Sequence, residues 1–321
     1  MFKALIESLR PRQWTKNFLV FGALFFVPGA LLMPALFGRA MLSFLLFSFA
    51  AGAGYLINDV KDIDYDRSHP RKRNRPIASG RLPVGIALTW VFILVAIVLA
   101  AGYWLDITEV ALPESATHLE GVAFPFLWTV GGYLVLTFVY SVWLRRVPLL
   151  DVLILSIGFT LRAVAGAVAL KVIISPWLLI VTGLLALYLA LGKRRQELVR
   201  LRNNVVNGDK PDPSTIRPAL AGYSVPLLDQ LLIISASLIL MGYSLYTFLH
   251  ADASDPRLML TIPFVIYGVF RYHSLIINES LGEAPDEVLL ADRPLAICII
   301  LWAIAVTVLL LWPGPVLMAS G

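Results

Sequence analysis

Long apolar runs are the feature of this sequence that most restricts its fold. A helix needs about 20 mostly apolar residues to cross a bilayer, and roughly nine runs here reach that length. None of them alternates strictly with a period of two, so helices are favoured over a barrel of strands. The expected spans are residues 17–37, 40–57, 84–105, 122–143, 148–170, 175–192, 228–250, 258–275 and 295–313.

The composition agrees with a polytopic membrane protein. The chain is 59% hydrophobic and 15% charged, whereas a soluble protein carries about 25% charged residues. We therefore expect an all-α bundle of about nine transmembrane helices, folded as a single domain over residues 1–321, with long loops at residues 58–83, 193–227 and 271–294. The only cysteine, Cys298, excludes an intramolecular disulfide, and the four histidines lack the spacing of a zinc site.

The distribution of basic residues predicts an orientation. If the amino terminus is cytoplasmic, nearly all of the 26 lysines and arginines fall in cytoplasmic segments. Only Arg39, Lys171 and Arg257 fall on the other side, and only Arg162 falls within an expected span. This asymmetry fits the positive-inside rule, with the carboxyl terminus outside a cell (inner) membrane. It also accounts for the net charge of +5 without a nucleic-acid partner.

A cluster of acids follows the second apolar run in the segment "INDVKDIDYD". On a continuing helix, Asp59, Asp62 and Asp66 are spaced i, i+3 and i+7 and share one face. Three carboxylates that point together repel one another unless a cation lies between them, and carboxylate oxygens suit Mg²⁺. Asn58 adds a neutral oxygen, whereas Asp64 falls off this face and is expected to be solvated. The pattern predicts a Mg²⁺ site on the cytoplasmic side, formed by Asn58, Asp59, Asp62 and Asp66.

The alternative is a solvated loop whose acids pair with the bases that follow. These bases are Arg67, Arg71, Lys72, Arg73 and Arg75. We favour the metal site because the acids begin within the helix end, where unpaired charge is costly. A diphosphate bridged by Mg²⁺ keeps free anionic oxygens, and Lys72 and Arg75 are expected to bind them.

Other basic residues allow both structural and functional interpretations. Because charge inside a span is costly and commonly functional, we expect Arg162 to hold an anionic phosphate in preference to hydrogen-bonding helix carbonyls. Before the first span, Arg12 and Lys16 flank Trp14, a pattern that by itself indicates anchoring at the membrane interface. For these two residues, anchoring and phosphate binding both stay open.

Several motifs resemble the UbiA superfamily of intramembrane prenyltransferases. "NDVKDIDYD" followed by "RPIASG" is similar to the first aspartate-rich motif of that superfamily, which also has about nine helices and motifs on the inner side. "YSVWLRR" resembles its Tyr-Ser-x-x-Leu-[Lys/Arg] element, which implies substrate binding by Tyr140 and Arg145. Arg145 stands where lysine is common, so its charge is kept and its geometry differs. The resemblance covers most of the chain.

One departure from the superfamily pattern concerns the donor. Members that use prenyl diphosphates typically carry a second Asp-x-x-x-Asp motif after the sixth helix, whereas this chain has "LGKRRQEL". The resemblance therefore implies a cationic cluster in place of a second metal site, with Lys193, Arg194 and Glu197 binding substrate. A cationic cluster suits a donor with an additional phosphate, such as phosphoribosyl pyrophosphate.

A branch of the superfamily with this pattern transfers phosphoribosyl groups to decaprenyl phosphate in cell-wall arabinan synthesis. The resemblance to that branch moves Arg12 and Lys16 towards phosphate binding. Four acids near the last span could either gate a cavity or be solvated, and we expect them to be solvated. They are Glu283, Asp286, Glu287 and Asp292. The segments similar to that branch are "RPRQWTKN", "HPRKRNRPIASG", "LRAVAGAVA", "GKRRQEL" and "GEAPDEVLLADR".

Together these patterns predict a Mg²⁺-dependent enzyme that transfers the phosphoribosyl group of phosphoribosyl pyrophosphate to a polyprenyl phosphate and releases pyrophosphate. Asp59, Asp62 and Asp66 are the expected catalytic residues. An alternative within the same fold is transfer of a prenyl group from its diphosphate to an aromatic or lipid acceptor. A transporter is disfavoured because the charge gathers at one face and no repeat is visible. A membrane scaffold would not need three clustered carboxylates, and homo-oligomerisation stays open.

Overall fold

The computed structural model describes residues 1–27, 29–68, 72–113, 116–119, 121–206, 218–250, 256–278, 288 and 291–311. Within these ranges the chain is nearly all helical and has no strand, only an isolated bridge between His118 and Val172. Its contacts divide the chain into two compact units. Unit 1 comprises Met1–Arg145 and Leu161–Ile173, and unit 2 comprises Arg146–Thr160 and Ile174–Gly321.

The prediction of an all-α polytopic membrane protein is confirmed. Among the described residues, 8 helices are long and apolar enough to cross a bilayer. Each lies at one of the expected runs, with boundaries shifted by several residues. The helices that contain them are α3 (Pro34–Lys61), α5 (Val84–Ile107), α6 (Pro125–Val142), α7 (Leu150–Leu170), α8 (Pro176–Val206), α9 (Val225–His250), α10 (Ile262–Asn278) and α12 (Arg293–Leu311).

The first expected span, residues 17–37, is wrong as a single helix. The chain there forms the 3₁₀-helix η1 (Pro11–Phe21), the short α2 (Gly22–Phe26) and the 3₁₀ turn η2 (Ala30–Leu32). Gly29 has a φ of +80°, a left-handed conformation that ends regular helix. Hydropathy detects apolar character and not helical continuity, so it joined these pieces into one span.

The helix η1 is unusually long for its type. Runs of 3₁₀-helix seldom exceed about 4 residues, whereas η1 has 11. It packs closely against the second half of α7, since a Cβ on Gly166 would lie 1.9 Å from the carbonyl oxygen of Val20. A larger side chain at Gly166 would push η1 away, which gives the small residues of "LRAVAGAVA" a packing role.

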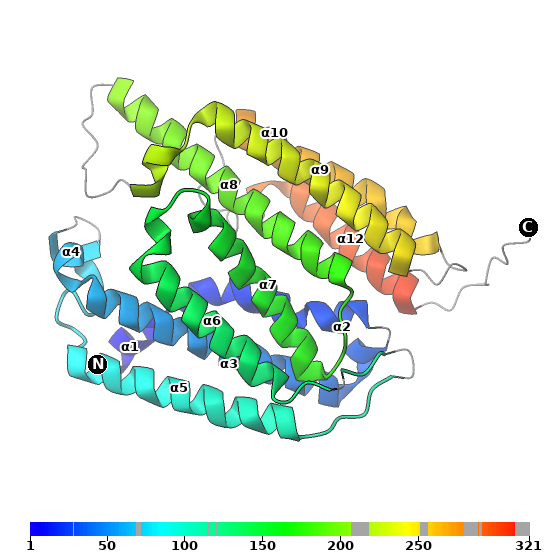
Figure 1. Ribbon diagram of the computed structural model, residues 1–321, viewed down its shortest axis with the longest axis horizontal. Helices are drawn as coiled ribbons and strands as arrows, with labels where there is room; N and C mark the ends of the chain where they lie inside the picture. Colours follow the sequence, from blue (N-terminus) through cyan, green and yellow to red (C-terminus); the bar gives the residue numbers. More distant parts are fainter. Residues whose placement is uncertain are drawn as a thin grey trace, which may run out of the picture. The chain divides into compact units, whose positions relative to one another are not determined.

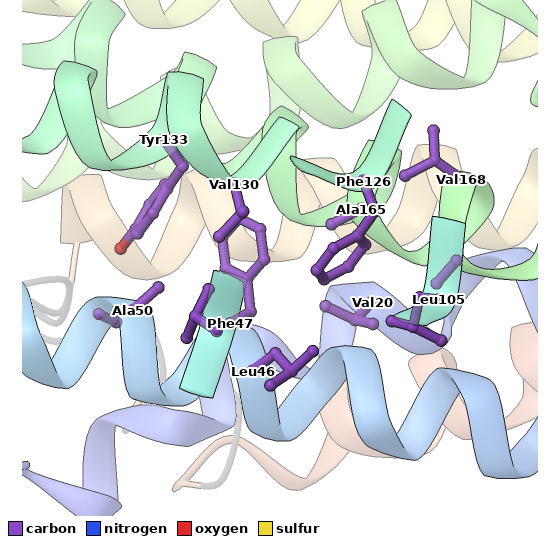
Figure 2. Close-up of a cluster of buried hydrophobic side chains, with 13 residues drawn as sticks. Val20, Leu46, Phe47, Ala50, Leu105, Phe126, Val130, Tyr133, Ala165 and Val168 are labelled. Carbon is purple, nitrogen blue, oxygen red and sulfur yellow. The ribbon is translucent and has the colours of Figure 1, made fainter. Parts of the chain in front are cut away.

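The core of unit 1 lies among η1, α3, α5, α6 and the second half of α7. Helices α3 and α5 lie side by side (Figure 1). Figure 2 shows Phe47 of α3 among the side chains of α6, and its ring centroid lies 4.6 Å from that of Tyr133. Small residues of α3 allow this packing, as a Cβ on Gly54 would lie 3.3 Å from Thr137. Close packing of this kind holds helices together where lipid surrounds them.

Arg39 ties three helices of unit 1 together. The sequence placed it in an outer loop, but it lies within α3 and its side chain is buried. Its guanidinium donates to the Ala169 carbonyl at 2.6 Å, to Thr108 Oγ1 at 2.8 Å and to the Leu105 carbonyl. The last carbonyls of a helix lack intrahelical partners, and Arg39 satisfies those at the ends of α5 and α7. Arg162 is therefore not the only arginine within a span.

Unit 2 contains a group of long helices joined by short 3₁₀ segments. Helices α8 and α9 lie side by side, and α10 packs against α12 (Figure 1). Trp302 of α12 donates a hydrogen bond of 2.8 Å to the hydroxyl of Tyr243 in α9. The connecting segments described are η6 (Pro218–Gly222) and η7 (Pro256–Thr261).

Replacing Arg39 should destabilise unit 1. In Arg39→Met the carbonyls at the ends of α5 and α7 lose their donors, at a cost of about 1–3 kcal/mol for each buried group left unpaired. We expect the purified protein to melt several degrees lower in a thermal-shift measurement. The exposed Arg73→Met is the control and should melt close to wild type. Equal melting temperatures for Arg39→Met and wild type would contradict the assigned role.

Candidate active site

Two buried aspartates at the end of α3 share an arginine. Asp59 lies in the last turn of α3, Asp66 lies in the short α4 (Ile63–Ser68), and both side chains are buried. Arg75 Nη1 lies 3.1 Å from Asp59 Oδ1 and 2.7 Å from Asp66 Oδ2. Arg10 Nη2 contacts the same Asp59 oxygen at 2.5 Å. The two acids thus lie together, as their spacing along a helix predicts, but they pair with Arg75, which is the contact that the disfavoured ion-pair alternative expects.

Asp62 pairs with a different arginine. It is the C-cap residue of α3, with φ −94° and ψ 16°, and its N–H donates to the Asn58 carbonyl at 2.9 Å. Its carboxylate oxygens lie 3.1 and 3.3 Å from the two terminal nitrogens of Arg145. This hydrogen bonding raises the pKa of Arg145 above its usual value. The break between α3 and α4 therefore gives Asp62 a partner that Asp59 and Asp66 do not have.

The residues present fit a hard divalent cation such as Mg²⁺, although arginines hold them here. In the described part of the chain no three acidic, histidine or cysteine side chains form a metal-binding group. However, Asp66 Oδ1 is buried and has no hydrogen-bond partner, although a buried carboxylate oxygen normally has one. Carboxylate oxygens are the donors that Mg²⁺ prefers. Asp59 and Asp66 are the best-placed ligands, and Asn58 and Asp62 stay predicted ligands.

Arg10 belongs to this cluster and was not among the residues predicted from the sequence. Its backbone is left-handed, with φ 53°, and its guanidinium lies 4.7 Å from the ring centroid of Tyr55 as well as against Asp59. A left-handed conformation costs a residue with a side chain about 1–2 kcal/mol. The signal available in the sequence was the motif "RPRQWTKN", which begins at Arg10.

The other predicted residues of this region have varied surroundings. Lys72 lies over the ring of Tyr65, 4.7 Å from its centroid. Arg12 is exposed, whereas Lys16, Asn58 and Tyr140 are half-buried. The solvated position predicted for Asp64 is confirmed, because its side chain is 94% exposed. For Lys72, Arg12, Lys16 and Tyr140, substrate binding stays a prediction.

Of the acids near the last span, only Asp292 lies within the described residues. Its expected solvation is wrong, because its side chain is only 9% exposed and accepts a hydrogen bond of 2.6 Å from Arg271. This hydrogen bond lowers the pKa of Asp292 below its usual value. The residues of this region and the motif loop that lie outside the described residues are His69, Arg71, Glu283, Asp286 and Glu287.

Arg162 lies in a buried polar network of unit 1. Its Nε donates to Asn17 Oδ1 at 2.7 Å, and its Nη2 donates to the Tyr133 hydroxyl at 3.0 Å. Asn17 in turn donates to Ser48 Oγ at 2.9 Å, which fixes the orientation of its amide. The network joins η1, α3, α6 and α7. These contacts support a structural role for Arg162, with side chains as partners in place of the helix carbonyls of the structural alternative. Phosphate binding by Arg162 stays a prediction.

In unit 2, the basic segment of α8 contains a buried ion-pair network. Arg194 Nε donates to Asp151 Oδ2 at 2.7 Å, and its Nη1 donates to Glu197 Oε2 at 2.9 Å. The Tyr223 hydroxyl donates to Asp151 Oδ1 at 2.6 Å and accepts the Leu149 N–H at 2.7 Å. Burial raises the pKa of Tyr223, which keeps the phenol protonated and able to donate. Neither Asp151 nor Tyr223 was among the residues predicted for the site.

The helices define a multi-pass membrane protein, and each of its two units contains one cluster of charged side chains. The model of the UbiA prenyltransferase family matches residues 17–287. The chain therefore belongs to the UbiA prenyltransferase family, a family of membrane transferases, as its aspartate-rich motif predicts.

Named relatives and solved structures agree with this family. A decaprenyl-phosphate phosphoribosyltransferase of Corynebacterium glutamicum is 33% identical over 94% of this chain and 85% of its own length. The enzyme of the same name in Mycobacterium tuberculosis is 29% identical over 93% of this chain and 91% of its own length. A UbiA homolog from Archaeoglobus fulgidus, solved with GPP and Mg²⁺, has a TM-score of 0.64 at 19% identity, covering 96% of this chain and 99% of that one. At this identity the likeness shows the fold alone.

Removing the acid beside Arg194 should destabilise unit 2. Breaking a buried ion pair costs about 3–5 kcal/mol, and Asp151→Asn removes one of the two carboxylates that hold the buried Arg194, leaving only Glu197. We expect Asp151→Asn to melt well below wild type. Tyr223→Phe should lose about 1–2 kcal/mol, since it removes two hydrogen bonds but no charge.

The double variant Asp151→Asn/Arg194→Met separates the ion pair from general loss of packing. It should melt higher than Asp151→Asn alone, because the buried guanidinium that lost one of its two carboxylates is gone. Additive losses in the double variant would show that Asp151 and Arg194 do not depend on each other.

Proposed function

We propose that this enzyme transfers the 5-phosphoribosyl group of phosphoribosyl pyrophosphate to a polyprenyl phosphate and releases pyrophosphate. Relatives named decaprenyl-phosphate phosphoribosyltransferase, which match more than nine-tenths of the chain, support the reaction. The observation that carries the choice of donor is the basic segment of α8. There a buried arginine, Arg194, lies between Asp151 and Glu197 where prenyl-diphosphate users are expected to have acids for a second metal ion.

The arginines around the aspartate motif are suited to bind the diphosphate. Arg10, Arg75 and Arg145 lie against Asp59, Asp66 and Asp62, so a bound diphosphate would meet several guanidinium groups at once. Guanidinium groups bind phosphate oxygens in a fixed, often bidentate geometry. In unit 2, we propose Lys193 as the residue that contacts a phosphate and Arg194 as a positioning residue, because Arg194 is buried and held by two carboxylates.

The reaction depends on stabilising the leaving diphosphate and needs no general base. Asp59, Asp62 and Asp66, with Asn58, would hold Mg²⁺, which neutralises charge on the departing diphosphate. The bond between ribose C1 and the diphosphate oxygen breaks, and its electron pair leaves with pyrophosphate. A phosphate oxygen of the polyprenyl phosphate forms the new bond to C1. That oxygen is already anionic near neutral pH, so no general base is needed.

We propose that the site faces the cytoplasm at the cell (inner) membrane. The positive-inside rule supports this orientation, because the aspartate motif lies in a segment rich in lysine and arginine. A phosphorylated sugar donor is charged and water-soluble, so it would reach the site from this side. The polyprenyl chain would stay among apolar helix surfaces, and the product would serve the synthesis of cell-wall arabinan.

A second candidate function keeps the aspartate site and changes the donor to a prenyl diphosphate. The observation that favours it is the match of residues 17–287 to the UbiA prenyltransferase family. The absence of a second acidic motif disfavours it. Both reactions break a carbon–oxygen bond to a diphosphate, so the aspartate cluster would serve either.

One assay distinguishes the two donors. Purified protein is incubated with Mg²⁺, a polyprenyl phosphate and phosphoribosyl pyrophosphate labelled in the ribose. We expect labelled lipid and released pyrophosphate in equal amounts. Transfer from a prenyl diphosphate to an aromatic or lipid acceptor, with no labelled lipid in the first assay, would overturn the proposal in favour of the second candidate.

The aspartates should be needed for turnover and not for folding. We expect Asp59→Ala and Asp62→Ala to abolish label transfer while the detergent-solubilised protein elutes as a single folded species. Asp64→Ala is the matched control, because its side chain lies in the same motif and is 94% exposed. It should retain activity close to that of wild type. Near-normal turnover by Asp59→Ala would remove the metal assignment.

A further inference from the structure

Every aspartate assigned to the metal in the motif already has an arginine as counter-ion. Asp59 contacts Arg10 and Arg75, Asp66 contacts Arg75, and Asp62 contacts Arg145. Three carboxylates therefore face three guanidinium groups, and this cluster is electrically balanced in the absence of a ligand. The balance matters because Asp59 and Asp66 are buried, where unpaired charge is costly.

This balance works against a divalent cation that arrives alone. A free Mg²⁺ would bring two positive charges to a group of carboxylates that arginines have already neutralised. It would also have to compete with Arg75 for Asp59 Oδ1 and Asp66 Oδ2, which lie 3.1 and 2.7 Å from the same nitrogen. Charges repel more strongly at a partly buried site than in water. Asp66 Oδ1 differs from these two oxygens, because it is buried and has no hydrogen-bond partner that a metal ion would have to displace.

A diphosphate changes this competition. Its anionic oxygens offer Arg10 and Arg75 an alternative partner, and their transfer to the diphosphate would release the aspartate oxygens for the cation. The metal and the diphosphate would then each remove an obstacle to the other. We propose that Arg10 and Arg75 act as exchangeable counter-ions that couple metal binding to diphosphate binding, so that neither ligand binds tightly without the other.

The two arginines are held in place for this role. Arg10 keeps a left-handed backbone at the start of η1, with its guanidinium against Asp59, and strained residues of this kind gather at functional sites. Arg75 belongs to a turn whose own hydrogen bonds fix it, since its N–H donates to the Lys72 carbonyl at 2.9 Å. The same turn is anchored by Ile77 and Leu82, which are buried in the core of unit 1.

The proposal rests on the metal site of the proposed function but not on the identity of the donor. Inorganic pyrophosphate carries the group common to both candidate donors, so it is the appropriate probe. Coupling between two ligands is reciprocal: if pyrophosphate tightens Mg²⁺ binding, Mg²⁺ must tighten pyrophosphate binding by the same factor. This equality can be measured without turnover.

Isothermal titration calorimetry on the full chain in detergent tests the coupling. Mg²⁺ is titrated with and without saturating pyrophosphate, and pyrophosphate with and without Mg²⁺. Mg²⁺ and pyrophosphate also bind each other in solution, so a titration without protein is subtracted from both series. We expect each ligand to tighten the other by about tenfold or more, within the range of roughly 5–150-fold usual for coupled sites. Less than about twofold enhancement in wild type would overturn the proposal, because that is below this range.

Arginine variants test whether these residues carry the coupling. In Arg75→Gln, Mg²⁺ alone should bind more tightly than to wild type, and the enhancement by pyrophosphate should fall to about twofold or less, below the usual coupled range. Arg10→Gln should show the same change to a smaller degree, because Arg10 contacts one aspartate and Arg75 contacts two. Arg75→Lys keeps the charge and should keep most of the coupling.

Arg81→Gln is the matched control, because Arg81 pairs with the exposed Glu7 and contacts none of the motif aspartates. It should couple the two ligands as wild type does. Weaker binding of Mg²⁺ to Arg75→Gln, with coupling unchanged, would show that Arg75 supports the metal site instead of competing with the metal. If Arg75→Gln does not fold, the wild-type titrations and Arg10→Gln decide the matter. Coupling in wild type together with failure of the phosphoribosyl assay would leave this inference intact and overturn only the choice of donor.

Discussion

The structure depends on the pairing of charged groups that lie away from water. Arg39 and Arg194 are both buried, and each has hydrogen-bond acceptors within 2.7 Å. Arg39 satisfies helix-terminal carbonyls, which have no partner within their own helices, and Arg194 satisfies a carboxylate. In a membrane protein such pairs help to set the positions of helices, because a buried charge without a partner has no water to hydrate it.

The sequence predicted where the membrane-spanning helices lie better than it predicted where the helical backbone breaks. Length and hydropathy located the eight helices that, among the residues the structure describes, are long enough to span a membrane, because each is a continuous apolar run. They failed at residues 17–37, where a left-handed Gly29 and a 3₁₀-helix divide an apolar stretch. They also failed for Arg39, which the gap between two runs placed in a loop. A single charged residue lowers hydropathy whether or not the backbone remains helical, so sequence alone cannot distinguish a loop from a buried arginine.

The candidate site was predicted to a similar degree. Spacing along a helix placed Asp59 and Asp66 together, and both are buried beside Arg75. Spacing could not predict that α3 would end at Lys61 and give Asp62 to Arg145, because that break depends on the backbone of one residue. Nor could it predict the contact between Arg10 and Asp59, which are 49 positions apart in the chain. Long-range partners of this kind are set by packing, and only the motif around Arg10 indicated that the segment mattered.

The arginines explain how such an acidic motif can fold before any ligand binds. Three carboxylates at a helix end would destabilise unit 1 if they had only one another as neighbours, and a metal ion would then be needed for folding. With Arg10, Arg75 and Arg145 as counter-ions, the charge is balanced from the start. Under the proposed coupling, the counter-ions would need a new partner when a metal binds, and an anionic diphosphate would provide one. Stability without ligands and the proposed joint binding of metal and donor would then have the same physical origin.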